Sequence, residues 1–316
     1  MNDRLFLAII QTISFFDIFS FPLTKEELYR YLWQYPEDIS FTTFVQQLEN
    51  ILQETNSIET YGGYYFLVGK RQDIYTRERR VWFVEERIKK AKKAVKTLRW
   101  IPFLRGVFIC NMLQVTAQKD SDIDVFIVVQ KNRLWITRLL LTITLHLFRF
   151  RRHGNCVANR LCLSFYCTDD VLDLSQIAIE KPDIYLAYWL ILLEPIFTDR
   201  SIQKEMEQQN NWLNEYFSPK RMLVTSQNTT TPPARFSKTI HTFFTVAWKG
   251  GYGDMIEKQA KELQKKKMDI LSQQPEQGSV RDVRISDTML KFHENDRRSH
   301  FCAVWKKKWQ ALRTTT

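Results

Sequence analysis

The sequence contains few glycines and few cysteines, and it lacks two common phosphate-binding loops. Nine glycines are spread over 316 residues, and neither a GxxxxGKS/T nor a GxGxxG pattern occurs. P-loop and Rossmann folds are therefore not indicated. The five cysteines are an odd number, without a CxxC pair or a Cys/His cluster at zinc spacing. This usage disfavours a zinc module and predicts a reducing, cytoplasmic location.

No apolar run is long enough to predict a transmembrane helix. The stretch Leu134–Phe148 is apolar, but it has 15 residues and contains Arg138 and His146, whereas a spanning helix needs about 20 residues. The first residues, with Asp3 and Arg4, have helical periodicity instead of the apolar block of a signal peptide. We expect no membrane partner, and we expect 134–148 to be a buried helix packed on a sheet.

Positive charge is in excess and is unevenly distributed. The net charge is +11; residues 1–200 carry 26 basic and 23 acidic side chains, and residues 201–316 carry 20 and 12. A basic region suits a polyanionic partner such as RNA or DNA. The alternative is a solvated basic face on helices. The length allows two or three domains and leaves oligomerisation open.

The clearest chemical signal lies in residues 107–130. Two apolar runs, 107–110 and 125–129, are typical of strands, and an acidic segment that ends in Asp122-Ile123-Asp124 separates them. Residues two apart on a strand share a face, so both carboxylates project together while Ile123 turns toward the core. Paired carboxylates repel each other unless a cation such as Mg²⁺ lies between them. We predict a metal site here; the alternative is a solvated acidic turn.

The segment Ser121-Asp122-Ile123-Asp124, followed by Val-Phe-Ile-Val, resembles the Asp-x-Asp strand of the DNA polymerase beta-like nucleotidyltransferase superfamily. The resemblance covers roughly residues 101–197. It implies a Mg²⁺- or Mn²⁺-dependent enzyme that moves a nucleoside monophosphate from an NTP to an acceptor hydroxyl on nucleic acid, protein or a small molecule. It also implies that Asp122 and Asp124 are catalytic metal ligands, and that Cys110, Asn111 and Ser121 contact the NTP.

Two features depart from the family pattern. Cys110 and Asn111 stand where the family has Gly and Ser, and a glycine there lets phosphate approach backbone N–H groups. The strand at 160–167, which matches the one that carries the family's third carboxylate, contains no acid. We expect Ser164 to face the site. These departures favour an alternative, a catalytically degenerate scaffold that binds nucleotide or nucleic acid.

The N-terminal part resembles a winged helix-turn-helix. Three helical stretches precede a hairpin signal at Gly62-Gly63, and Thr24 with Glu27 forms a predicted capping box at the second stretch. The third stretch, 41–53, would be the recognition helix, yet it contains no Lys or Arg. DNA contacts rely on those side chains. A packing, dimerisation or substrate-positioning role is therefore favoured over a winged-helix DNA-binding regulator.

Together these patterns predict an α+β multidomain fold, because strands and helices alternate in the central part. We expect a winged-helix domain at 1–69, a basic linker helix at 70–100, a nucleotidyltransferase-like mixed sheet with flanking helices at 101–199, and a mostly helical basic region at 200–316. The central part should end in an apolar helix at 183–197 that stops near Glu194-Pro195. Near the C-terminus, Trp305 and Trp309 flank three lysines. They either stack on single-stranded nucleic acid or belong to a docked helix.

Overall fold

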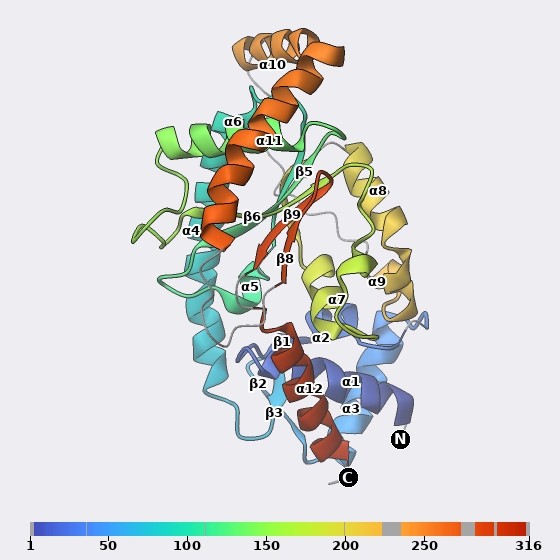
Figure 1. Cartoon of the computed structure of the whole chain (residues 1–316). Helices are drawn as coiled ribbons and strands as arrows, with labels where there is room; N and C mark the ends of the chain where they lie inside the picture. The colour runs from blue at the N-terminus through green and yellow to red at the C-terminus, as the bar shows by residue number, and fades with distance from the viewer. Residues whose placement is uncertain are drawn as a thin grey trace.

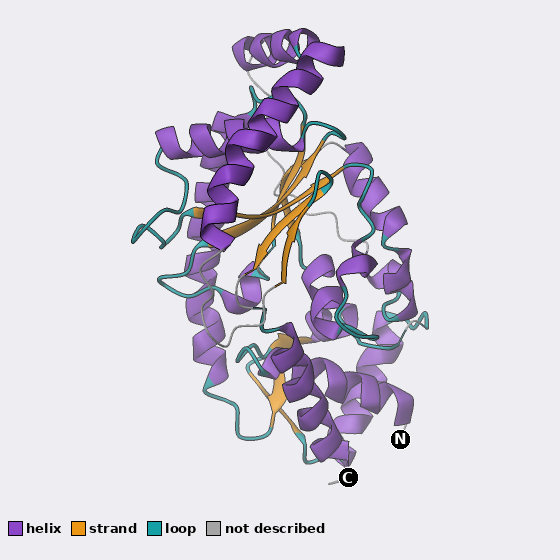
Figure 2. Ribbon diagram, viewed as in Figure 1, coloured by secondary structure: helices purple, strands orange, loops and turns teal. Residues whose placement is uncertain are grey.

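The chain has an α+β architecture with two sheets enclosed by helices (Figure 2). The computed structural model describes residues 3–35, 37–110, 112–198, 200–222, 235–272, 282–293 and 296–313. The small sheet lies near both termini, and the large sheet lies at the centre (Figure 1).

The N-terminal unit contains three helices and a three-stranded antiparallel sheet in the order β1-β3-β2. The capping box is confirmed, because the Thr24 side chain accepts from the backbone of Glu27 and the Glu27 carboxylate accepts from the Thr24 N–H. Gly62 and Gly63 both have positive φ and join β2 to β3, as a two-residue hairpin turn requires. The elements of the N-terminal unit are α1 (Asp3–Asp17), β1 (Leu23–Thr24), α2 (Lys25–Arg30), α3 (Phe41–Glu54), β2 (Ile58–Tyr61) and β3 (Tyr64–Leu67).

One long helix, α4 (Asp73–Leu98), runs from the small sheet to the large one (Figure 1). The predicted linker helix is therefore present, although its basic residues do not all point to solvent. Arg80 and Arg87 are buried, and Ala91, Ala94 and Val95 pack into the core of the large sheet. This helix ties the two parts of the molecule together.

The large sheet has six strands in the order β7-β4-β5-β6-β9-β8. The β5–β6 pair is parallel, and the other neighbouring pairs are antiparallel. A mixed sheet is therefore confirmed. Its strands are β4 (Leu104–Ile109), β5 (Ile123–Val129), β6 (Leu161–Thr168), β7 (Glu194–Thr198), β8 (Asp282–Ile285) and β9 (Met289–His293).

The two faces of β5 pack against different helices. Ile123, Val125 and Ile127 belong to the core under α4, α6 (Leu134–Leu147) and α11 (Gly250–Ser272). Phe126 and Val128 belong to a second core with α7 (Ile184–Ile191) and α8 (Arg200–Gln209). Asp122 and Asp124 share the parity of Phe126, so their side chains emerge on the second face.

The structure differs from the sequence predictions in two places. The apolar helix predicted at 183–197 ends at Ile191, and residues 194–198 form strand β7. Pro195 cannot continue a helix, and it is tolerated in β7 because this strand is at the edge of the sheet. The described part of the C-terminal region is mostly helical, as predicted, but the sheet expected within 101–199 also takes β8 and β9 from that region, which extend it beside β6 (Figure 1).

The last helix, α12 (Arg298–Arg313), packs against α1 (Figure 1). Trp305 is 3% exposed, and its indole N–H donates to the carbonyl of Gln11 at 2.9 Å. The structure thus supports the docked helix and leaves Trp305 unavailable for stacking on bases. The remaining helices of the described residues are α5 (Leu113–Thr116), α9 (Pro219–Met222) and α10 (Arg235–Ala247), with two short 3-10 helices, η1 (Leu174–Ile177) and η2 (Asn211–Glu215). No helix within the described ranges has the length and apolar character needed to cross a bilayer.

Candidate metal centre

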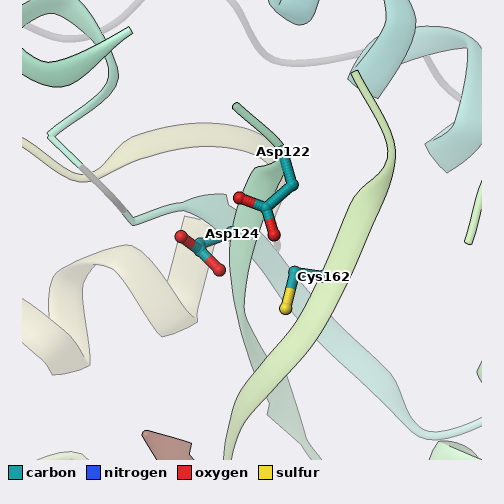
Figure 3. A group of neighbouring side chains, drawn as sticks. All are labelled: Asp122, Asp124 and Cys162. Atoms are coloured by element: carbon teal, nitrogen blue, oxygen red, sulfur yellow. The ribbon is translucent and has the colours of Figure 1, made fainter. Parts of the chain in front are cut away.

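Three side chains converge where strands β5 and β6 begin (Figure 3). Asp122 immediately precedes β5, Asp124 is its second residue, and Cys162 lies opposite Asp124 on the parallel strand β6. One ligand atom from each residue lies within 4.8 Å of the other two. The sequence prediction that the two carboxylates project together is confirmed by this geometry. Carboxylate oxygens suit Mg²⁺ or Mn²⁺, and the donor set therefore fits a divalent cation.

The environment of Asp124 raises the pKa of its carboxyl group. Burial, and next the negative charge of Asp122, raise the pKa of Asp124 to about 6 from its ordinary value of 3.8. Hydrogen bonds from Cys162 and Ser164 oppose this rise. Two carboxylates at this separation cannot both ionise without cost, and a bound cation would remove that cost.

Cys162 adds a softer donor that sequence reasoning missed. Burial, and next the charge of Asp124, raise the pKa of the Cys162 thiol to about 12, so the group is a neutral thiol near pH 7. A neutral thiol is a weak ligand, since the thiolate is the form that binds metal. The carboxylates are therefore the principal donors. A usable signal existed: Ser164 was expected to face the site, and Cys162 lies two residues before it on the same strand.

An arginine neutralises part of the acidic charge. Arg152 donates to the Asp122 carboxylate at 2.6 Å and lies 3.8 Å from the Cys162 sulfur. Its side chain is 47% exposed, so it can turn toward solvent when another cation binds the carboxylates. The local sequence gives no sign that Arg152, and not its neighbours Arg149 and Arg151, faces the site.

Ser121 has a local structural role in the described geometry. Its hydroxyl accepts from the Gln118 N–H and donates to the Gln118 carbonyl, both at 2.9 Å. The buried Arg87 of α4 donates to the Ser121 carbonyl at 3.0 Å and to the Ser121 hydroxyl at 3.2 Å. Arg87 also donates to the Gln118 carbonyl. These bonds fix the loop that leads into Asp122.

The other predicted residues are distributed around the pair. Cys110 is buried directly after β4, and its N–H donates to the Asp124 carbonyl at 3.1 Å, so this N–H is already used within the sheet. Asn111 lies outside the described residues. Ser164 faces the site as expected, with its hydroxyl 3.5 Å from an Asp124 oxygen. Asp170, which follows β6, pairs with Lys131 at 2.9 Å.

A cavity of about 230 Å³ adjoins the pair on the face of α7. Asp124 and Cys110 form part of its wall, and residues from β9 and α12 form another part. Asp124 therefore borders a partly open cavity.

No family model, curated protein or solved structure matches the chain. The geometry of the site is accordingly the basis for a functional assignment.

Proposed function

We propose that the chain is a metal-dependent nucleotidyltransferase that moves a nucleoside monophosphate from an NTP to an acceptor hydroxyl. The observation that carries this proposal is the convergence of Asp122 and Asp124 where the central strands β5 and β6 begin, with Asp124 bordering a cavity. These two residues would hold Mg²⁺ or Mn²⁺. When bound, such a cation neutralises the triphosphate and favours attack by the acceptor oxygen. The bond from that oxygen to the α-phosphorus forms as the bond to pyrophosphate breaks.

The surroundings support a polyanionic acceptor such as RNA or DNA. Helix α4 passes the site, where Arg87 holds the loop before Asp122. Its exposed surface carries Trp82, which is 80% exposed and has Glu78, Glu85 and Glu86 within about one turn, and a set of cations, of which Lys89 pairs with Glu85. The exposed ring can stack on bases, and the cations nearer the end of the helix can contact phosphates. The exposed cations are Arg79, Lys89, Lys93 and Lys96.

We further propose that the N-terminal unit is a winged helix that positions the acceptor. Its element order, three helices followed by a β-hairpin, supports this assignment. Helix α3 contains two glutamates and no Lys or Arg, which argues against use as a DNA recognition helix. A winged-helix DNA regulator is therefore a weaker candidate.

A second candidate is a degenerate scaffold that binds nucleotide without transferring it. It is favoured by Cys110, whose backbone N–H is engaged by the sheet, and by the absence of an acid on β6. Strand β6 is described along its whole length, and Cys162 and Ser164 are the side chains that it directs to the site.

The test is transfer of label from a mixture of α-labelled NTPs with Mg²⁺ or Mn²⁺. Reactions contain the protein alone, with total RNA or with cell extract, and an Asp122→Asn/Asp124→Asn variant serves as the control. We expect labelled acceptor that disappears in the variant. Nucleotide binding without label would favour the degenerate scaffold. Absence of both label and binding would refute the proposal.

A further inference from the structure

The candidate metal centre combines two kinds of donor atom, and strand register brings them together. Asp124 on β5 pairs with Cys162 on the parallel strand β6, and residues opposite each other in neighbouring strands project from the same face of the sheet. Asp122 lies two residues before Asp124 and shares this face. Two carboxylates and one thiol therefore meet where the two strands begin (Figure 3).

The separation of the donor atoms is close to that of ligands around one ion. A carboxylate oxygen from Asp122, one from Asp124 and the Cys162 sulfur all lie within 4.8 Å of one another. In a tetrahedral zinc site, with bonds of about 2.0–2.3 Å, adjacent ligand atoms lie about 3.3–3.8 Å apart. Small movements of three side chains would therefore let all three donors contact the same ion.

A positive group of the protein already contacts both kinds of donor. One guanidinium nitrogen of Arg152 lies 2.6 Å from an Asp122 oxygen and 3.8 Å from the Cys162 sulfur. The site therefore accommodates a cation between the oxygen and the sulfur. The Arg152 side chain is 47% exposed, so it can leave this position for solvent when a metal ion takes its place.

The sulfur decides which cation the three donors suit. Mg²⁺ requires oxygen ligands in octahedral geometry and usually keeps several waters. Zn²⁺ accepts thiolate and carboxylate ligands in a four-coordinate site, and three protein ligands with one open position are a common arrangement. Thiolate ligands also favour zinc over harder divalent ions such as Mg²⁺. Two oxygens and one sulfur therefore fit Zn²⁺ better than Mg²⁺.

We propose that Cys162 is the third ligand of the metal centre and gives the centre a preference for Zn²⁺ over Mg²⁺ when no nucleotide is bound. As the sulfur–zinc bond forms, the thiol proton passes to solvent, because the thiolate is the form that binds metal. The inference deepens the proposed function, since it assigns the ion that Asp122 and Asp124 hold before a substrate arrives. It rests on the metal site of that proposal and not on the transfer reaction.

The experiment titrates the metal-free protein with Co²⁺, a spectroscopic probe of zinc sites, in a phosphine reductant and without nucleotide. A cobalt–thiolate bond absorbs in the near ultraviolet, whereas carboxylate ligands alone give no such band. We expect the wild type to develop this band, and we expect Zn²⁺ to abolish it by displacing Co²⁺. Mg²⁺ at the same concentration as Zn²⁺ should leave the band in place.

Two variants assign the band to one sulfur atom. Cys162→Ser should lose the band and weaken Zn²⁺ binding by about a hundredfold, because losing even a hydrogen-bond partner of a metal ligand costs about 10- to 100-fold. It should still bind Mn²⁺ as the wild type does, since both carboxylates remain. Cys156→Ser is the matched control, because Cys156 is an exposed cysteine outside the cluster. This control should change neither the band nor the Zn²⁺ affinity.

A wild type without the band would overturn the proposal, as would a band and a Zn²⁺ affinity that survive in Cys162→Ser. Label transfer separates this failure from failure of the proposed function. Transfer that vanishes in the Asp122→Asn/Asp124→Asn variant, without a thiolate band in the wild type, would refute only the role of Cys162. A thiolate band that depends on Cys162, without label transfer by the wild type, would refute only the enzyme assignment.

Discussion

Replacing Asp124 with Asn should stabilise the metal-free protein at alkaline pH while it abolishes metal binding. Burial and the charge of Asp122 hold the folded-state pKa of Asp124 at about 6, above its ordinary value of 3.8. The folded state therefore binds this proton more tightly than the unfolded state does. The contribution of Asp124 to stability becomes less favourable as the pH rises from about 4 through 6, and the full penalty is present above about pH 7.

The difference between 3.8 and about 6 sets the size of the effect. At 1.36 kcal/mol per pKa unit, it amounts to up to about 3 kcal/mol at pH 8. An asparagine of similar shape carries no charge, so the variant avoids this penalty. We expect its free energy of unfolding to match that of the wild type to within about 1 kcal/mol at pH 4 and to exceed it by up to about 3 kcal/mol at pH 8.

Urea unfolding in EDTA at pH 4 and pH 8 measures this difference. The control is Asp120→Asn, which removes an equal charge from an exposed position in the preceding loop and should alter stability by less than about 0.5 kcal/mol. An Asp124→Asn variant that is equally destabilised at both pH values would refute the reasoning. It would show that the contacts of Asp124 stabilise the fold and that ionisation of its buried carboxyl group does not lower the free energy of unfolding.

Two other substitutions test the proposed metal site and the packing of α12. Arg152→Gln removes the cation that competes for Asp122 and should tighten Mn²⁺ binding in calorimetric titrations by up to about fivefold, which is the scale of an exposed ion pair. Arg149→Gln is the matched control, and weaker Mn²⁺ binding by the Arg152 variant would contradict the prediction. Trp305→Ala should lower the free energy of unfolding by about 3–5 kcal/mol, because a buried ring and its bond to Gln11 are lost. A urea midpoint unchanged from the wild type would show that α12 does not depend on this side chain.

Local pattern was enough to locate the carboxylate pair and several fold elements. The period-2 alternation around Ile123 predicted that Asp122 and Asp124 share a face, because side-chain direction along a strand follows from backbone geometry alone. The capping box at Thr24 and the turn at Gly62-Gly63 were equally local, since each depends on residues within one turn.

Pairing between distant strands decided the rest of the candidate site. Cys162 adjoins the aspartates because β6 lies parallel to β5 in a particular register, and a shift of one residue would turn its side chain to the other face. Lys291 reaches the cavity because β9 crosses from the C-terminal region to pair with β6.

The sequence by itself therefore determined which residues are acidic and which face of their strand they occupy, and the proposed cation site rests on these two facts. Only the tertiary structure decided their neighbours, which are Cys162, Arg152 and the residues of β9 and α12 that line the adjoining cavity. The physical reason is that periodicity reports the direction of each side chain relative to its own backbone, whereas strand order and register depend on contacts between segments that are far apart in the chain.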